Sequence, residues 1–85
     1  MSLEGRTIRV TRDNIRKGEP NSCIMCPIAK ALRKVSNKKR VWVDEDCITV
    51  GNRTYSIPNV ASDFIYDFDC GEEVRPFSFK MGELD

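Results

Sequence analysis

The sequence of 85 residues contains no histidine. This absence excludes catalytic triads of the Ser-His-Asp type and metal sites that need an imidazole ligand. No apolar run approaches the roughly 18 residues that a membrane-spanning helix needs. The five glycines are scattered along the chain, so no glycine-rich phosphate loop is present. These absences predict a protein that is not an enzyme and has no membrane span.

The chain also lacks internal repeats, low-complexity tracts and linkers, and its length predicts a single domain over residues 1–85. The N-terminal stretch MSLEGRTIRV has no signal-peptide hydrophobic core. We therefore expect a cytoplasmic location, where thiols stay reduced. Residues 1–5 are expected to be frayed or foreign to the native chain.

The net charge of +1 conceals an uneven distribution of charge along the sequence. Residues 1–42 carry eleven Lys and Arg against three Asp and Glu, which gives +8. Residues 43–85 carry three Lys and Arg against ten Asp and Glu, which gives −7. Such asymmetry is typical of interaction proteins, and it also allows head-to-tail self-association. The alternative is that the two halves mix in space and neutralise each other.

Periodicity of the apolar residues predicts strands and helices in alternation. The predicted class is α+β, with one antiparallel sheet packed against two main helices. The sheet is expected to combine a β-meander with one N-terminal and one C-terminal strand. The predicted strands lie within 6–11, 38–58 (a meander with a Gly-Asn hairpin turn) and 75–81, and the helical segments within 11–18, 27–37 and 59–71.

Both main helices have recognisable ends in the sequence. Pro27 suits the first position of a helix, which puts Cys26 at the N-cap. The second helix can be capped by Asn59 or Ser62, and Gly71 is a suitable residue just beyond its end. The stripe predicted to be buried on this second helix consists of Val60, Ala61, Phe64, Ile65 and Phe68.

The four cysteines are Cys23, Cys26, Cys47 and Cys70. Cys23 and Cys26 have the Cys-x2-Cys spacing of a zinc knuckle, and their place near a helix N-terminus could favour the thiolate form. A structural zinc site usually has two such pairs, whereas Cys47 and Cys70 stand alone. We therefore interpret Cys26 mainly as the start of a helix and predict no cofactor. A cysteine-ligated zinc module and a redox dithiol remain the alternatives.

The strongest interaction signal is the basic segment RKVSNKKRVW, residues 33–42. Its cations could contact phosphates or an acidic partner, and its tryptophan could stack on a base if exposed. The alternative is a solvated loop whose tryptophan packs inside the fold. Acidic residues around Asp63, Asp67 and Asp69 could instead hold a basic protein. The candidate residues for nucleic-acid or partner binding are Arg33, Lys34, Lys38, Lys39, Arg40 and Trp42.

Two stretches of the sequence resemble a family of small phage and bacterial proteins to which no activity is assigned. The pattern begins with CPIA-x-AL at the helix that starts with Cys26 and Pro27. It continues with F-I-x-x-F-D-x-G from Phe64 to Gly71, and ends with V-x-P-F-x-F from Val74 to Phe79. The resemblance covers about three quarters of the chain, but Cys23, Cys47 and Cys70 are outside the pattern.

This resemblance implies an origin in a phage or mobile element. Small phage proteins are often non-enzymatic binders of host machinery, including inhibitors of host defence, and their location is then the host cytoplasm. The first hypothesis is accordingly an accessory protein that binds and modulates a host macromolecule, most simply a protein. The second is a nucleic-acid-binding protein that uses residues 33–42, and the third is the zinc module.

Overall fold

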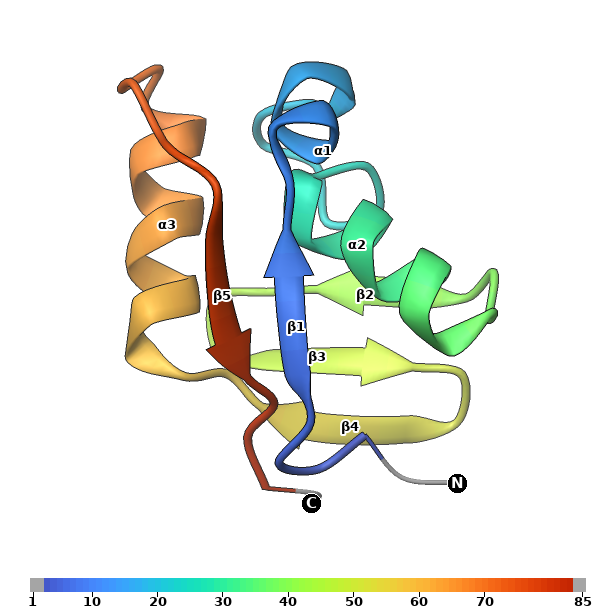
Figure 1. Ribbon diagram of the computed structural model, residues 1–85. Coiled ribbons are helices and arrows are strands. Elements are labelled where there is room, and N and C mark those ends of the chain that lie inside the picture. The colour runs from blue at the N-terminus through green and yellow to red at the C-terminus, as the bar shows by residue number, and fades with distance from the viewer. Residues whose placement is uncertain (1–2, 84–85) are drawn as a thin grey trace.

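Alternating apolar and polar residues form the strands of this protein, which pack with three helices (Figure 1). The structure is a computed structural model that describes residues 3–83. This arrangement confirms the predicted α+β class. The elements in chain order are β1 (Thr7–Val10), α1 (Arg12–Lys17), α2 (Pro27–Ser36), β2 (Val41–Val43), β3 (Cys47–Val50), β4 (Arg53–Ser56), α3 (Asn59–Asp69) and β5 (Phe77–Lys80).

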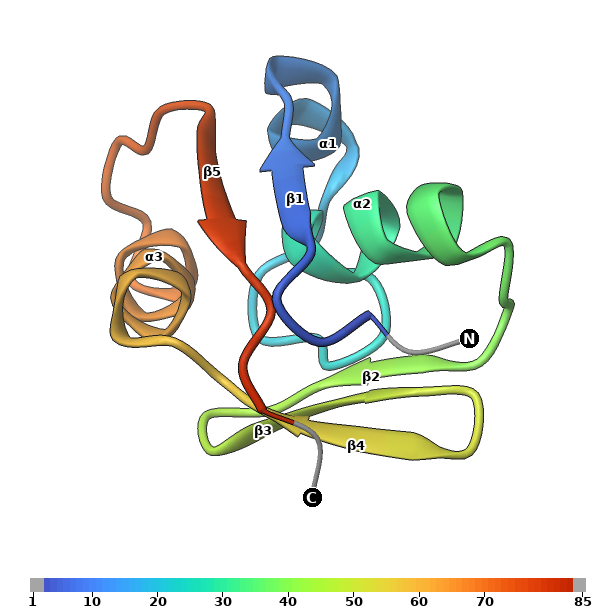
Figure 2. The same cartoon turned by 60° about the horizontal axis from the view of Figure 1, so that its bottom comes forward.

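The strands divide between two antiparallel sheets and do not join in the one sheet that was predicted. β1 pairs with β5, while β2, β3 and β4 form the meander in that order. Figure 1 shows β1 and β5 running across the strands of the meander, and Figure 2 shows them in a layer with α2 and α3 over one of its faces. Because each sheet has one apolar face, stacking the two sheets buries both faces.

The meander turns its apolar face toward this second layer. Val43 pairs with Ile48, which in turn pairs with Tyr55, and all three side chains are buried. The hairpin between β3 and β4 turns at Gly51, whose φ of +62° lies in the left-handed region that a glycine adopts without strain. The opposite face carries Trp42, which is exposed, and Thr49, which is half-buried.

The first main helix begins and ends as its sequence predicts. Cys26 is the N-cap of α2, and its Sγ accepts a hydrogen bond from the Ala29 N–H at 3.4 Å. Pro27 occupies the first helical turn, and the helix ends at Ser36 with Asn37 as its C-cap, whose φ is +59°. The buried side chains of Ile28 and Leu32 pack into the core between the layers.

The second main helix, α3, differs from the prediction at its start. Its N-cap is Pro58, which offers no side-chain hydrogen bond, so neither Asn59 nor Ser62 caps it. Val60 is 51% exposed, and its predicted burial is wrong. Successive helical residues point about 100° apart, so the buried stripe that contains Ala61 and Phe64 turns the neighbouring Val60 outward.

Aromatic contacts join α3 to the two-stranded sheet. The ring of Phe64 lies 4.6 Å from that of Phe77 on β5, measured between centroids. Phe77 in turn lies 5.7 Å from Phe79, which is buried and pairs with Ile8 of β1. Phe77 and Phe79 therefore share a face of the sheet. No helix within residues 3–83 combines the length and the apolar character needed to cross a membrane.

The start of the described chain is held in the fold. Leu3 is buried, its N–H donates to the Tyr55 hydroxyl at 3.0 Å, and the Gly5 N–H donates to the Met81 carbonyl at 3.1 Å. The predicted fraying is therefore wrong for residues 3–5. Residues 1 and 2, which belonged to the same prediction, lie outside the described part of the chain.

Candidate binding surface around Trp42

Trp42 lies on the outer face of the meander, where it is 51% exposed. It occupies the middle of β2, between the buried Val41 and Val43, because neighbouring residues of a strand point to opposite faces. Its cross-strand partner is Thr49, which is paired with Thr54 in the next strand. The three residues form a row across the sheet, so the tryptophan stands beside two small polar side chains.

A groove of about 610 Å³ runs beside Trp42, and we call it the Trp42 groove. Ile24 forms part of its wall and is 46% exposed, so two large apolar side chains are open to solvent here. Cations from the basic segment lie beside them, together with one carboxylate. The lining residues are Ile24, Arg33, Lys39, Arg40, Val41, Trp42, Asp44, Cys47 and Thr49.

Arg33 shapes the Trp42 groove through bonds to the backbone. Its Nε donates to the Lys39 carbonyl at 3.2 Å, and its Nη2 donates to the Ile24 carbonyl. The guanidinium thus ties the loop before α2 to the loop after it. Because a guanidinium has five N–H donors in a fixed fork, Arg33 can hold both loops and still face the groove. Its main role in this geometry is to position the groove.

The remaining cations of the basic segment point in different directions. Lys39 and Arg40 line the Trp42 groove, whereas Lys38 lines a separate pocket on the other side of the loop between α2 and β2. Lys34 is exposed on α2 and lines neither. The structure therefore brings together Arg33, Lys39, Arg40 and Trp42 of the six predicted residues.

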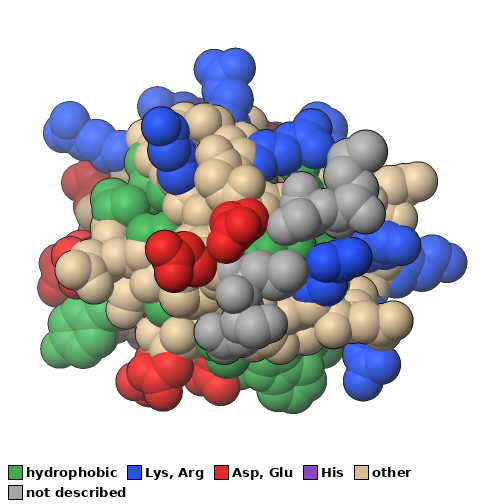
Figure 3. All heavy atoms as spheres, turned by 90° about the horizontal axis from the view of Figure 1, so that it is seen from below, with side chains coloured by type: hydrophobic (Ala, Val, Ile, Leu, Met, Phe, Trp, Pro, Cys, Tyr) green, Lys and Arg blue, Asp and Glu red, His purple; other side chains and the backbone are tan. Residues whose placement is uncertain are grey.

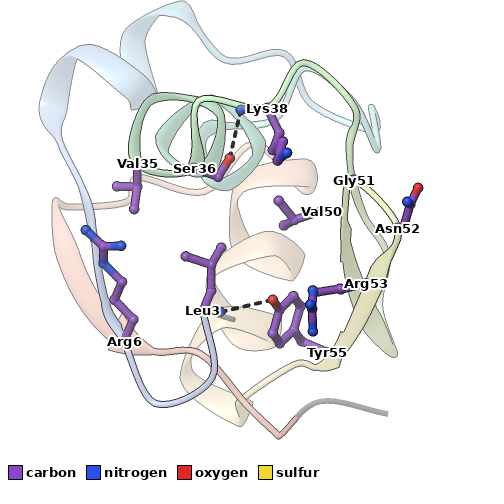
Figure 4. A pocket seen from close by; sticks show the side chains of 10 residues that line it. All are labelled: Leu3, Arg6, Val35, Ser36, Lys38, Val50, Gly51, Asn52, Arg53 and Tyr55. Carbon is purple, nitrogen blue, oxygen red and sulfur yellow. Dashed lines mark hydrogen bonds between the residues drawn. The ribbon is translucent and has the colours of Figure 1, made fainter. Parts of the chain in front are cut away.

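The separate pocket, here called the cationic pocket, has a volume of about 410 Å³ (Figure 4). It lies between the chain before β1, the end of α2 and the β3–β4 hairpin. Arg6 and Arg53 join Lys38 there, and sequence reasoning missed both because they are isolated cations far apart in the chain. The lining residues are Leu3, Arg6, Val35, Ser36, Lys38, Val50, Gly51, Asn52, Arg53 and Tyr55.

The cysteines do not form the chemical site that their spacing suggested. Cys23 and Cys26 line a small hollow of about 160 Å³, whereas Cys47 lies in the Trp42 groove and Cys70 is the exposed C-cap of α3. All four are free thiols. Within residues 3–83, no group of three or more Cys, Asp or Glu side chains is placed to hold a metal ion. The zinc hypothesis thus gains no support from the geometry.

The environment of Cys23 and Cys26 favours the protonated thiol. Burial, aided by the carboxylates of Asp44 and Asp69, raises the pKa of Cys23. Burial also raises the pKa of Cys26, and it outweighs the lowering effect of the N–H groups at the start of α2. The expectation that the helix N-terminus favours thiolate is therefore wrong, because desolvation penalises the charged form more strongly. A redox dithiol gains no support.

Charged side chains of the two signs are unevenly spread over the face seen in Figure 3. Cationic side chains lie mainly along the upper and right parts of this view, and acidic ones lie at the left, below and near the centre. The ion pairs found within residues 3–83 join Arg16 and Lys17 to Asp13, all on α1. Neither pair links the basic half of the sequence to the acidic half.

Scans of this chain against protein-family models, curated proteins and solved structures found no match. The resemblance to small phage and bacterial proteins, and the origin that it implies, therefore stay predictions. The functional argument rests on the groove and the pockets themselves.

Proposed function

We propose that this chain is a non-enzymatic binding protein whose Trp42 groove holds an acidic segment of a partner protein. The observation that carries the proposal is the joint exposure of Trp42 and Ile24 beside Lys39 and Arg40. Tryptophan and arginine dominate the energetics of protein interfaces, because each combines a large contact area with polar donors. An apolar side chain of the partner would contact Trp42, and its carboxylates would pair with the two cations.

The chemistry of the groove supports binding more than catalysis. Asp44 is the one carboxylate among its lining residues, Cys47 is the one thiol, and the sequence has no imidazole. A nucleophile needs a base within hydrogen-bond reach, and that base is usually a histidine. The arrangement offers contact area and positive charge, which are the properties of a recognition surface.

Positive charge around the groove also suits capture of an acidic partner. Charged surfaces of opposite sign accelerate encounter, and this acceleration falls as salt screens the charges. If the resemblance to small phage proteins holds, the partner is a protein of the host cell, for example a component of host defence, and binding modulates it. This identification of the partner rests on the resemblance alone, whereas the acidic character of the partner follows from Lys39 and Arg40.

Fluorescence of Trp42 tests the proposal directly, because Trp42 is the single tryptophan of the chain. We expect a synthetic acidic peptide that contains Leu and Phe to shift Trp42 emission to shorter wavelength in a saturable titration. The double variant Lys39→Ala/Arg40→Ala should weaken binding by about tenfold, since exposed ion pairs contribute roughly 0.2–1 kcal/mol each and about 1.4 kcal/mol corresponds to tenfold.

The matched control is Arg12→Ala/Lys34→Ala, which removes the same net charge from outside the groove. It should bind the peptide with nearly unchanged affinity. Unchanged emission at millimolar peptide, or equal weakening in both double variants, would contradict the proposal. In the second case, net charge alone would explain the binding.

One observation favours single-stranded nucleic acid as a second candidate ligand. Trp42 stands in a row with Thr49 and Thr54 on the outer face of the meander, where a base could stack on the indole. In the same titration, a single-stranded DNA oligonucleotide would then quench Trp42 emission, with an affinity that falls steeply as salt rises. Tighter binding of the oligonucleotide than of the peptide would favour this candidate over a partner protein.

A further inference from the structure

We propose that the cationic pocket binds a small organic phosphate of about the size of a nucleoside monophosphate. The proposal does not rest on the Trp42 groove, because the two sites share no lining residue. It follows from the charge, the donors and the size of the pocket. Each of these properties is produced by residues that are distant in sequence.

The pocket gathers three cations without a carboxylate among its lining residues. Arg6 precedes β1, Lys38 follows α2, and Arg53 begins β4, so three separate segments each place one cation around the pocket, with Arg6 and Arg53 on opposite sides of it (Figure 4). The ion pairs found within residues 3–83 involve only α1, so these three charges have no carboxylate partner there. A dianionic group would relieve this concentration of positive charge better than a single carboxylate would.

Tyr55 adds a directional donor at the wall of the pocket. It is 1% exposed, and its hydroxyl oxygen accepts the Leu3 N–H at 3.0 Å. A phenolic hydroxyl can accept and donate at the same time, so its own proton is available to an oxygen of the ligand. Arg53 and Tyr55 lie two residues apart on β4, so their side chains share the face of the strand that lines the pocket.

The size and the apolar wall indicate more than an inorganic ion. The volume of about 410 Å³ falls in the range of roughly 300–1,000 Å³ that is usual for small-molecule sites. Leu3, Val35 and Val50 supply an apolar wall among the polar side chains (Figure 4). Such a wall would contact a ring or sugar, while the cations hold the phosphate. A nucleoside monophosphate satisfies both requirements.

The test is a titration of the isotope-labelled full chain with adenosine 5′-monophosphate, followed by NMR. Saturable shifts are expected for the amides of Gly51, Arg53 and Tyr55. Inorganic phosphate should bind more weakly, and adenosine should produce no saturable shift over the same concentrations. The variants Lys38→Gln and Arg53→Gln should each lower the affinity by about tenfold, which is the usual loss for one charge-assisted hydrogen bond.

The control is Lys39→Gln, which removes the same charge from the adjacent residue but faces the Trp42 groove. It should keep the affinity of the unmodified chain. Absence of saturable shifts with the monophosphate would overturn the proposal, as would equal losses in Lys38→Gln and Lys39→Gln. If inorganic phosphate binds as tightly as adenosine 5′-monophosphate, the apolar wall does not contribute to binding as proposed. Because the Trp42 titration is a separate measurement, failure here leaves the proposed function to be judged on its own.

Discussion

At the scale of single residues, Cys26 acts as a cap at the start of a helix. Its side chain is 2% exposed, and its Sγ accepts the Ala29 N–H. We expect Cys26→Ala to lower the free energy of unfolding by about 1 kcal/mol, because the N–H would lose its partner at the N-terminus of α2. Urea denaturation followed by circular dichroism measures this loss.

A second cysteine provides the matched control for this cap. Cys70 is exposed at the end of α3, and the hydrogen bonds there come from its backbone N–H. Cys70→Ala should therefore change the free energy of unfolding by less than about 0.5 kcal/mol. Equal losses in the two variants would argue against the capping role of Cys26.

At the scale of elements, α3 carries charges that oppose its dipole. It has no acidic residue in its first turn and no basic residue in its last, while Asp67 lies near its C-terminus. We expect Asp67→Lys to raise the free energy of unfolding by about 1 kcal/mol at low salt. The substitution relieves the unfavourable dipole contact and places a cation four residues after Asp63. Thermal and urea denaturation measure the gain.

A second substitution on α3 separates the effect of the helix dipole on stability from the effect of the new ion pair. Asp63→Lys makes the same change of charge in the middle of α3, where the dipole has little effect. It should stabilise the protein less than Asp67→Lys, and both gains should shrink as salt screens the charges. A gain from Asp63→Lys as large as that from Asp67→Lys would exclude the dipole as the cause.

At the scale of the whole molecule, the chain after β5 ties the two sheets together. The Ser56 N–H at the end of β4 donates to the Glu83 carbonyl at 2.9 Å. A Cβ placed on Gly82 would lie 2.1 Å from the Ser56 carbonyl oxygen, and that oxygen belongs to the backbone. We expect Gly82→Ala to cost about 3 kcal/mol, because the two segments would have to separate.

Gly71 offers the comparison for this close approach. Its φ is +82°, but a Cβ there would meet nothing within 4 Å. Gly71→Ala should therefore cost only the roughly 1–2 kcal/mol of a left-handed backbone with a side chain. Urea denaturation of both variants tests the difference. A loss in Gly82→Ala no larger than that in Gly71→Ala would show that the contact with Ser56 relaxes without cost.

The sequence by itself determined the elements of this protein. The N-cap at Cys26, the stop at Asn37 and the turn at Gly51 all follow from neighbouring residues and from simple periodicity, whereas the sequence left the exposure of Trp42 open. Such features depend on bonds within a few residues, so a local pattern is enough to predict them. The start of α3 was mispredicted because Pro58 precedes two residues that are themselves good caps.

Only the tertiary structure decided how the elements and charges meet. An alternating strand specifies that one face is buried, but not which surface buries it, so the division into two sheets could not be predicted. The same holds for the cationic pocket, which Arg6, Lys38 and Arg53 line although they are distant in the sequence. The role of Arg33 could not be predicted either, because its hydrogen bonds to the carbonyls of Ile24 and Lys39 join two loops that are separated in sequence. Contacts between distant residues depend on packing of the whole molecule, which no local pattern encodes.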